Sequence, residues 1–354
     1  MGSRIDALKS LFASKNLDGY LVTGEKNMQY LTNFSGGSAL LIPDEEENVL
    51  FVHSVNYEAA KEEAKDVHVK LVRIGENLDE EVSKMITSLN LRRVGFDSLK
   101  AASYLKMRNL LKETALETAE DLLWSLRKVK DQKEVHLIKK AADLTSRGME
   151  KASEILEPGL KEREVAAEIE YEMRKAGSHG FAFESIVSSG PNSAFPHGGL
   201  GERVIEKGEL VVIDIGAKVE GYCADLTRTF IIGRPLPKQA EIYRIIEEAQ
   251  ASAVTMIRSG IEAREVDKAS RDYIAKMGYG EYFVHNLGHG LGLDVHEPPA
   301  LGPKSSDILS VGNVVTVEPG IYIPKFGGVR IEDTILVLEE RADKLTRAPI
   351  LPLS

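Results

Sequence analysis

Cysteine is almost absent from this sequence of 354 residues, which contains only Cys223. A single thiol cannot form a disulfide within the chain, so the sequence is compatible with a reducing compartment. Long apolar runs are also missing. Arg4, Asp6 and Lys9 interrupt the first segment, and no window reaches the length of a membrane span. We therefore expect neither a signal peptide nor a membrane anchor, and predict a cytoplasmic protein.

An excess of basic residues is lacking as well. The 45 lysines and arginines are outnumbered by 55 acidic residues, which gives a formal net charge of −10. This charge argues against nucleic acid or an anionic membrane as a partner, but it does not identify a substrate. The 43% of hydrophobic residues and 28% of charged residues are typical of a globular protein, and the length is ample for two domains.

Residues 4–120 contain neither a glycine-rich phosphate loop nor an obvious cluster of acids and bases. Their helical and strand patterns alternate, which predicts an α/β domain with a mixed sheet at residues 1–121. Residues 122–354 are predicted to form a second domain. In it, Asp131 and Glu134 have the spacing of a capping box at the start of a helix.

The clearest chemical signal begins at the aliphatic run 210–216, which predicts a buried strand. Asp214 lies in this run, and a buried carboxylate is costly unless a positive group meets it. No lysine or arginine lies within three residues, so that group must come from elsewhere in the fold. Asp225 follows a turn at 220–221 and precedes a second strand-like run at 226–232. The two carboxylates can therefore meet at one end of a hairpin.

The same pattern recurs later in the chain. Glu318 ends the predicted strand 314–317, and Glu332 lies in the strand-like run 329–338. Between the two hairpins, His289 supplies an imidazole flanked by glycines. Four carboxylates brought together would repel one another without cations. With one imidazole, they suit two hard divalent metal ions better than a thiolate-type zinc site. Any one of these acids alone is more readily explained as a paired or exposed charge.

Several short segments, in their order along the chain, carry a resemblance to a known family. They are residues 212–216, 225–230, 285–290, 296–297, 318–322 and 328–333. In these segments the chain resembles the pita-bread metallopeptidases, and among them the proline-specific members, prolidase and aminopeptidase P. The resemblance is strong from about residue 125 onward. The preceding part is similar to the N-terminal domain of prolidases and creatinases.

This resemblance implies an α/β N-terminal domain with a mixed sheet, followed by an α+β pita-bread catalytic domain of the creatinase/aminopeptidase type. It also implies two divalent metal ions per subunit. Asp225 and Glu332 should bridge both ions, Asp214 should bind one of them, and His289 and Glu318 should bind the other. Hard ligands favour Mn²⁺ or Co²⁺, with Zn²⁺ or Fe²⁺ as alternatives. In the family the N-terminal domain narrows the mouth of the active site, often across a dimer, which implies a homodimer.

The implied reaction is hydrolysis of an Xaa-Pro peptide bond by a hydroxide that bridges the two metal ions. Glu318 is the expected proton shuttle. His197 and His296 resemble the pair that holds the substrate carbonyl and stabilises the tetrahedral intermediate. Without the resemblance, His197 would be as well explained as a surface residue. His285 is expected to line the pocket, although a core or surface role is nearly as well supported. Arg330 resembles an arginine linked to the prolyl end of the substrate, and its alternative role is to orient ligand carboxylates.

Xaa-Pro dipeptides are the favoured substrates, with short peptides as the alternative. Some close prolidases carry an arginine four positions after the histidine of their His-Glu pair, whereas this chain has Ala300. This departure keeps aminopeptidase P, which acts on longer Xaa-Pro peptides, as the main alternative. A metal-free creatinase-like hydrolase and a non-catalytic binding module rank lower, because all five ligand residues are present. Methionine aminopeptidases share the ligands but generally lack a leading domain of about 120 residues.

Overall fold

The computed structural model describes residues 3–199 and 201–348. The chain divides into two compact units, Met1–Arg127 and Lys128–Ser354. The domain limits predicted from the sequence, 1–121 and 122–354, stay a prediction. Among the described residues, no helix combines the length and the apolar character needed to cross a bilayer.

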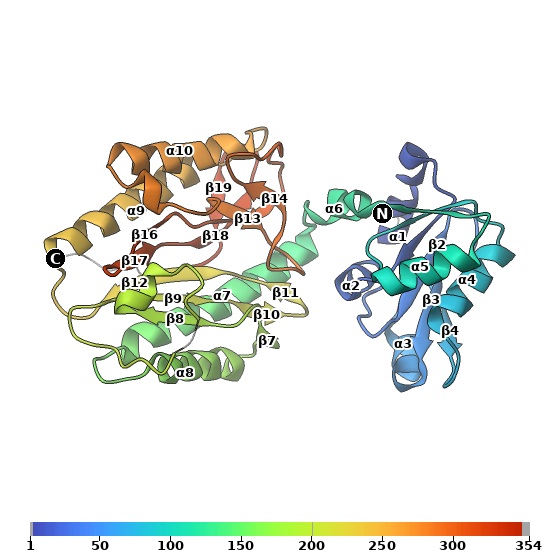
Figure 1. Ribbon diagram of the computed structural model, residues 1–354, viewed down its shortest axis with the longest axis horizontal. Coiled ribbons are helices and arrows are strands. Elements are labelled where there is room, and N and C mark those ends of the chain that lie inside the picture. The colour runs from blue at the N-terminus through green and yellow to red at the C-terminus, as the bar shows by residue number, and fades with distance from the viewer. Residues whose placement is uncertain (1–2, 200, 349–354) are drawn as a thin grey trace. The chain divides into compact units, whose positions relative to one another are not determined.

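The first unit is built on one six-stranded sheet, drawn in blue to cyan in Figure 1. The strand order is β4-β3-β2-β1-β5-β6, and both parallel and antiparallel pairs occur, so the predicted mixed sheet is confirmed. Leu41 and Phe51 of the sheet share a buried apolar core with Ile86 of α4. The elements are β1 (Gly19–Val22), β2 (Ala39–Pro43), β3 (Val49–His53), β4 (His68–Val72), β5 (Arg93–Phe96) and β6 (Ala115–Thr118), with α1 (Arg4–Lys9), α2 (Glu25–Thr32), α3 (Tyr57–Glu63), α4 (Leu78–Ser88), α5 (Ala101–Leu110) and α6 (Glu120–Arg127).

The second unit consists of two halves with the same order of elements (Figure 1). In each half, two helices precede a pair of antiparallel strands, and a small hairpin separates the two strands of the pair in sequence. The first half contains α7 (Gln132–Ile155), α8 (Glu162–Lys175), β7 (Gly180–Phe181), β8 (Ile186–Ser189), β9 (Leu210–Ile215), β10 (Ala217–Val219), β11 (Tyr222–Cys223) and β12 (Leu226–Ile231). The second contains α9 (Pro237–Met256), α10 (Ala263–Lys276), β13 (Gly288–Gly290), β14 (Glu297–Leu301), β15 (Val314–Val317), β16 (Gly320–Ile323), β17 (Gly327–Arg330), β18 (Asp333–Val337) and β19 (Ala342–Lys344).

The predicted cap of α7 is present. The side chain of Asp131 accepts a hydrogen bond of 2.8 Å from the backbone N–H of Glu134, and the side chain of Glu134 accepts one of 3.0 Å from the backbone N–H of Asp131. These bonds satisfy donors that the first helical turn leaves without partners.

Strand alternation explains how acidic residues can lie in aliphatic strands. In β9, Ile213 and Ile215 belong to the apolar core that includes α7 and α8, and Asp214 between them lines a pocket. In β15, Val317 belongs to the core under α9 and α10, and Glu318, the next residue, also lines the pocket. Successive side chains of a strand point to opposite faces, so one face builds the core and the other carries the acids.

The single strand predicted over residues 329–338 is wrong in one respect. The structure has two strands there, β17 and β18, separated by Ile331 and Glu332, because β17 pairs with β16 and β18 pairs with β15. The backbone N–H of Glu332 instead donates a hydrogen bond of 3.1 Å to the carbonyl of Thr227 at the start of β12. The break therefore places Glu332 where strands of the two halves meet.

Candidate active site

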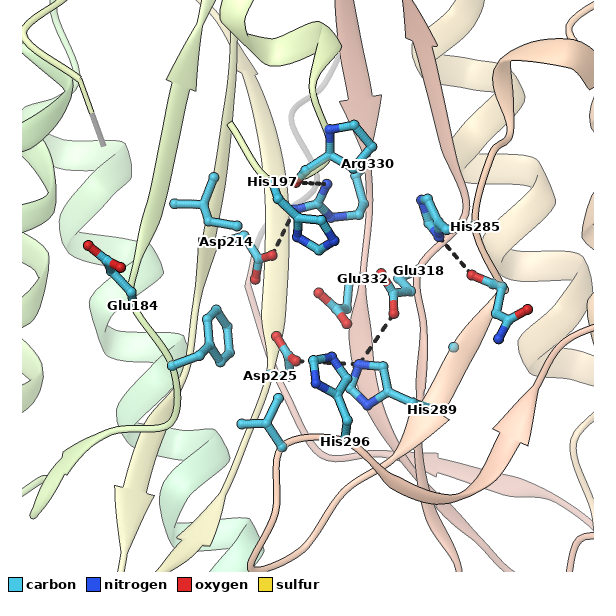
Figure 2. A pocket seen from close by; sticks show the side chains of 16 residues that line it. Glu184, His197, Asp214, Asp225, His285, His289, His296, Glu318, Arg330 and Glu332 are labelled. Atoms are coloured by element: carbon cyan, nitrogen blue, oxygen red, sulfur yellow. Dashed lines mark hydrogen bonds and ion pairs between the residues drawn. The ribbon is translucent and has the colours of Figure 1, made fainter. Parts of the chain in front are cut away.

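All the site residues predicted from the sequence line one pocket of the second unit, with a volume of about 590 Å³ (Figure 2). In the first half, Asp214 lies in β9 and Asp225 directly precedes β12; in the second half, Glu318 directly follows β15 and Glu332 directly precedes β18. His289 lies in β13. The pocket lining also includes apolar side chains that the sequence did not indicate. The predicted lining residues are His197, Asp214, Asp225, His285, His289, His296, Glu318, Arg330 and Glu332, and the apolar additions are Phe183, Ile186 and Val295.

Three of the five candidate ligands can reach one point. Asp225, His289 and Glu332 each offer an atom within 4.8 Å of the others, a spacing compatible with one metal ion. The Nε2 atom of His289 also lies 3.3 Å from Oε1 of Glu318 and 3.7 Å from Oδ2 of Asp225. Asp214 lines the same pocket, but its Oδ2 atom is held by Arg330 at 2.7 Å.

The orientation of His289 suits a ligand. Its Nδ1 atom lies 3.1 Å from the carbonyl oxygen of Gly290, and because a carbonyl only accepts, Nδ1 must carry the proton and donate it. This bond fixes the ring and directs Nε2 toward Asp225 and Glu318. A backbone carbonyl that fixes the non-ligating nitrogen is a common feature of histidines that bind metals.

Several oxygens of the acidic cluster lack partners. The Oδ1 atoms of Asp214 and Asp225 and the Oε1 atom of Glu332 are buried, and each has no hydrogen-bond donor among the described residues. A buried carboxylate oxygen without a donor or cation is unfavourable by several kcal/mol in order of magnitude. Divalent cations bound between these oxygens would remove that cost, so the residues present fit hard metal ions.

The pKa values of the acidic cluster also indicate that it needs a positive charge nearby. Burial raises the pKa values of Asp225 and Glu332 well above their ordinary values, and repulsion from neighbouring carboxylates raises them further. Burial also acts to raise the pKa of Glu318, but the hydrogen bond and charge of His289 outweigh it, so the pKa is lowered. A bound cation favours the ionised form of every carboxylate beside it.

Threonines that the sequence did not indicate hold the acidic side chains in place. The hydroxyl of Thr227 donates a hydrogen bond of 2.6 Å to Oε2 of Glu332. The hydroxyl of Thr316 lies 3.3 Å from Oε1 of Glu318 and accepts a bond of 3.1 Å from the backbone N–H of His289. Thr227 lies opposite Asp214 in the β9–β12 pair, and Thr316 lies two residues before Glu318, so each shares a strand face with a residue that lines the pocket. Each threonine is also two positions from a candidate ligand in the sequence, and this spacing is the one signal that could have suggested them.

Arg330 is deeply engaged within the protein. Besides its bond to Asp214, Nη1 donates to the hydroxyl of Tyr322 at 2.8 Å and to the carbonyl of Pro196 at 3.3 Å, and Nε donates to Thr227 at 3.1 Å. The Arg330 side chain is 3% exposed. The planar guanidinium therefore orients Asp214, and one of its five N–H groups has no partner among the described residues.

His285 is linked to the same network through Tyr322. Its Nδ1 atom donates to the carbonyl of Asn286 at 2.7 Å, so Nε2 accepts the hydroxyl proton of Tyr322 at 3.0 Å. Burial raises the pKa of Tyr322 to about 12, which keeps the hydroxyl protonated. Burial also lowers the pKa of His285. Both ring nitrogens of His285 are thus occupied, and the ring can face a substrate only through its carbon atoms.

His197 and His296 are exposed side chains in the pocket wall (Figure 2). The ring of His296 meets the ring of His289 edge to face, with centroids 4.3 Å apart. Burial, followed by repulsion from His289, lowers the pKa of His296. A neutral imidazole still carries one N–H, so His296 can donate a hydrogen bond near neutral pH.

Comparison with known proteins identifies the family. Metallopeptidase family M24 matches residues 136–339, and the creatinase/prolidase N-terminal domain matches residues 4–129. The chain belongs to metallopeptidase family M24. The resemblance and the fold class inferred from the sequence are therefore confirmed, and this M24 metallopeptidase depends on divalent metal ions as its family does.

Full-length relatives and structures support this membership. The Xaa-Pro dipeptidase of Pyrococcus furiosus is 39% identical over 348 residues, which is 98% of both chains. An Xaa-Pro dipeptidase structure from Bacillus anthracis aligns with a TM-score of 0.93 at 39% identity, covering 98% of both chains. An X-Pro aminopeptidase structure from Thermotoga maritima aligns with a TM-score of 0.90 at 32% identity, again covering 98% of both. The roles of individual site residues in this M24 metallopeptidase stay predictions.

Replacing Asp225 by Asn or Glu332 by Gln is expected to remove at least one metal ion per chain. Either change deletes a negative charge from the centre of the cluster and leaves a weaker neutral oxygen ligand. The measurement is metal content by mass spectrometry after dialysis of Mn²⁺-loaded protein. Glu184→Gln is the matched control, because Glu184 lines the same pocket but is not among the candidate ligands, and its metal content should equal that of the wild type. Full metal retention by both cluster variants would contradict the assignment.

Proposed function

We propose that this protein is a dinuclear metallopeptidase that hydrolyses Xaa-Pro dipeptides and releases the residue before proline. One observation carries the proposal: four carboxylates and His289 converge in a pocket of about 590 Å³ that two exposed histidines and several apolar side chains also line. Pockets of this size suit small-molecule substrates. The names of full-length relatives, Xaa-Pro dipeptidase in Pyrococcus furiosus and Bacillus anthracis, support the choice of substrate.

The ligand set proposed for the metal ions follows the cluster. Asp225 and Glu332 would each contact both ions, Asp214 would complete one site, and His289 with Glu318 would complete the other. The partnerless oxygens of Asp214, Asp225 and Glu332 support this assignment. When bound, divalent cations supply Lewis acidity and a water that ionises near neutral pH. Carboxylate-rich sites favour Mn²⁺ or Co²⁺, with Zn²⁺ or Fe²⁺ as alternatives.

Side chains of the protein would carry out the proton transfer, hold the substrate carbonyl and exclude water. Glu318 would accept the proton of the attacking water at a carboxylate oxygen and deliver it to the prolyl nitrogen that leaves. His197 and His296 would donate hydrogen bonds to the oxygen of the scissile carbonyl, which becomes negative as the water adds. Phe183, Ile186 and Val295 would exclude water from the apolar side of the substrate. The proline nitrogen carries no hydrogen, so the pocket needs no acceptor for it.

A second candidate, cleavage of longer Xaa-Pro peptides, is favoured by a specific observation. A dipeptidase has to hold the free carboxylate of its substrate with a cation, and four of the five N–H groups of Arg330 already have partners. Ala300, at the position where some prolidases carry arginine, adds none. The similarity to the X-Pro aminopeptidase structure of Thermotoga maritima is compatible with this alternative.

The proposal has two further parts. A homodimer is proposed from the family resemblance alone. A cytoplasmic location is proposed because the single Cys223 is compatible with a reducing compartment.

The experiment that tests the function is a substrate panel with Mn²⁺-loaded or Co²⁺-loaded protein. We expect kcat/KM for Ala-Pro to exceed that for Ala-Pro-Ala by about tenfold or more, since a tenfold difference corresponds to one well-made polar contact, and we expect no cleavage of Ala-Ala. Comparable or faster cleavage of Ala-Pro-Ala would identify an aminopeptidase. Cleavage of none of the proline substrates would reject both candidates.

The histidine pair gives a prediction about turnover. Replacing His197 or His296 by Ala should lower kcat for Ala-Pro by roughly 10²–10³, as removal of an oxyanion donor does. Metal content should not change, because neither residue is a proposed ligand. Wild-type turnover in both variants would show that these histidines only line the pocket.

Arg330 has two candidate roles, and its contacts favour the orientation of Asp214 over binding of the substrate carboxylate. We therefore expect Arg330→Ala to lower kcat/KM for Ala-Pro and for its C-terminal amide by a similar factor, roughly 10–100-fold, as the loss of a group that orients a metal ligand does. Metal content should fall in parallel. A rise in KM confined to the free acid, with metal content intact, would instead assign Arg330 to the carboxylate.

A further inference from the structure

Lys130 and Glu297 form an ion pair buried as deeply as any group of the active site. The Nζ atom of Lys130 lies 2.7 Å from Oε1 of Glu297, and each side chain is 1% exposed. Lys130 immediately precedes the cap of α7, whereas Glu297 begins β14 and directly follows His296. The two residues lie 167 positions apart in the sequence.

Such a pair is not explained by stability. Burying two charges costs about as much as their attraction returns, and well-packed apolar side chains of similar volume often serve as well or better. The pair does, however, fix the position of a strand end, because a short charged contact between buried side chains tolerates little displacement. The consequence for function depends on the side chains beside that strand end.

This strand end adjoins two histidines of the pocket, His296 and His289. Glu297 follows His296 along the chain and pairs across β13 and β14 with Gly290, the residue after His289. The packing is close: a Cβ atom added to Gly290 would lie 2.6 Å from the carbonyl oxygen of Glu297, and one added to Gly292 would lie 2.7 Å from its Oε1. Any shift of Glu297 would therefore move the backbone that holds the two rings 4.3 Å apart.

Lys130 itself is anchored independently of Glu297. Its backbone N–H donates a hydrogen bond of 2.9 Å to the carbonyl of Gly312, just before β15. The side-chain amide of Asn313 donates to the carbonyl of Lys128 at 2.8 Å. The position of Lys130 is therefore fixed within the second unit, and its ammonium group holds the carboxylate of Glu297 in place. The backbone N–H of Asp294 approaches the other carboxylate oxygen at 3.4 Å, which ties the loop before His296 to the same carboxylate.

We propose that Lys130 is a positioning residue for catalysis, which acts through Glu297 to hold His296 against His289 and in line with the substrate carbonyl. The inference rests on the proposed function of His296. It adds a residue from the start of the second unit that touches neither the metal ions nor the substrate.

The test compares Lys130→Met with the wild type as metal-loaded full-length protein acting on Ala-Pro. We expect kcat to fall about ten- to hundredfold, the usual cost of losing a partner that orients an active-site group. KM should change less than about threefold and metal content should not change, because the substitution replaces neither a proposed metal ligand nor a side chain that lines the pocket. Glu297→Gln and the double variant Lys130→Met/Glu297→Gln should lose no more than Lys130→Met, since two residues that act as one unit do not contribute additively.

Two controls separate positioning from general damage. Lys128→Met removes a partly exposed ion pair from the same segment, between Lys128 and Asp307 at 3.2 Å, whose carboxylate is eleven positions from His296 in the sequence. Its kcat should stay within about twofold of the wild type. Ile169→Ala empties a buried position in α8 and lowers the unfolding midpoint without touching the pair. At temperatures below that midpoint, the kcat of Ile169→Ala should also stay close to the wild-type value.

A crystal structure of Lys130→Met gives a readout that does not depend on turnover. The ring of His296 is expected to be displaced from its contact with His289. A displaced ring in a protein that cleaves no Xaa-Pro substrate would leave the positioning role standing and reject the proposed function. An undisplaced ring, or a kcat within twofold of the wild type with metals bound, would overturn the positioning role.

Discussion

The mutual repulsion of four carboxylates in one pocket is the constraint on which the second unit depends. Asp214, Asp225, Glu318 and Glu332 come from two halves of the chain, and each half contributes two of them. Internal groups meet only part of their charge: Arg330 binds Asp214 and His289 approaches Glu318, but one buried oxygen each of Asp214, Asp225 and Glu332 lacks a donor among the described residues. Divalent cations, on which the family depends, would meet the rest. Metal binding and the joining of the halves are therefore aspects of one electrostatic requirement.

Hydrogen bonds from the framework convert this charge cluster into a defined geometry. Thr227, from the first half, donates to Glu332 of the second, and the backbone of Glu332 bonds back to Thr227. Tyr322 connects Arg330 to His285, which extends the order of the cluster to the pocket wall. Because Thr227, Glu332, Tyr322 and Arg330 are buried, water cannot readily replace an altered contact among them, and the arrangement is held as a unit.

The sequence predicts well which charged side chains line the pocket, because their signal is local. A charged residue in an aliphatic strand, as at Asp214, is conspicuous without knowledge of its neighbours, and so are the glycines around His289. The capping box of α7 and the mixed sheet of the first unit are also local patterns. The partners of these groups are not local: nothing near Lys130 in the sequence indicates Glu297, and the strand break at Glu332 arises from pairing with strands far along the chain. Propensity describes a segment, whereas register and ion pairs depend on the assembled sheet.

The candidate metal ligands have little influence on the length of peptide that the protein prefers. In the proposed mechanism the metal ions and the histidines act on the scissile bond, which is the same in a dipeptide and in a longer peptide. Discrimination depends on a cation for the terminal carboxylate, and in this pocket Arg330 is largely committed to Asp214. If one arginine both orients a ligand and meets a carboxylate, substrate binding and metal geometry become coupled, because a single planar group cannot shift toward one without moving from the other. Where Arg330 stays bound to Asp214, the carboxylate of a free dipeptide would lack a cation, and the dipeptide would bind more weakly than its C-terminal amide. The preference for dipeptides or longer peptides would then depend on whether Arg330 binds Asp214 or the substrate carboxylate.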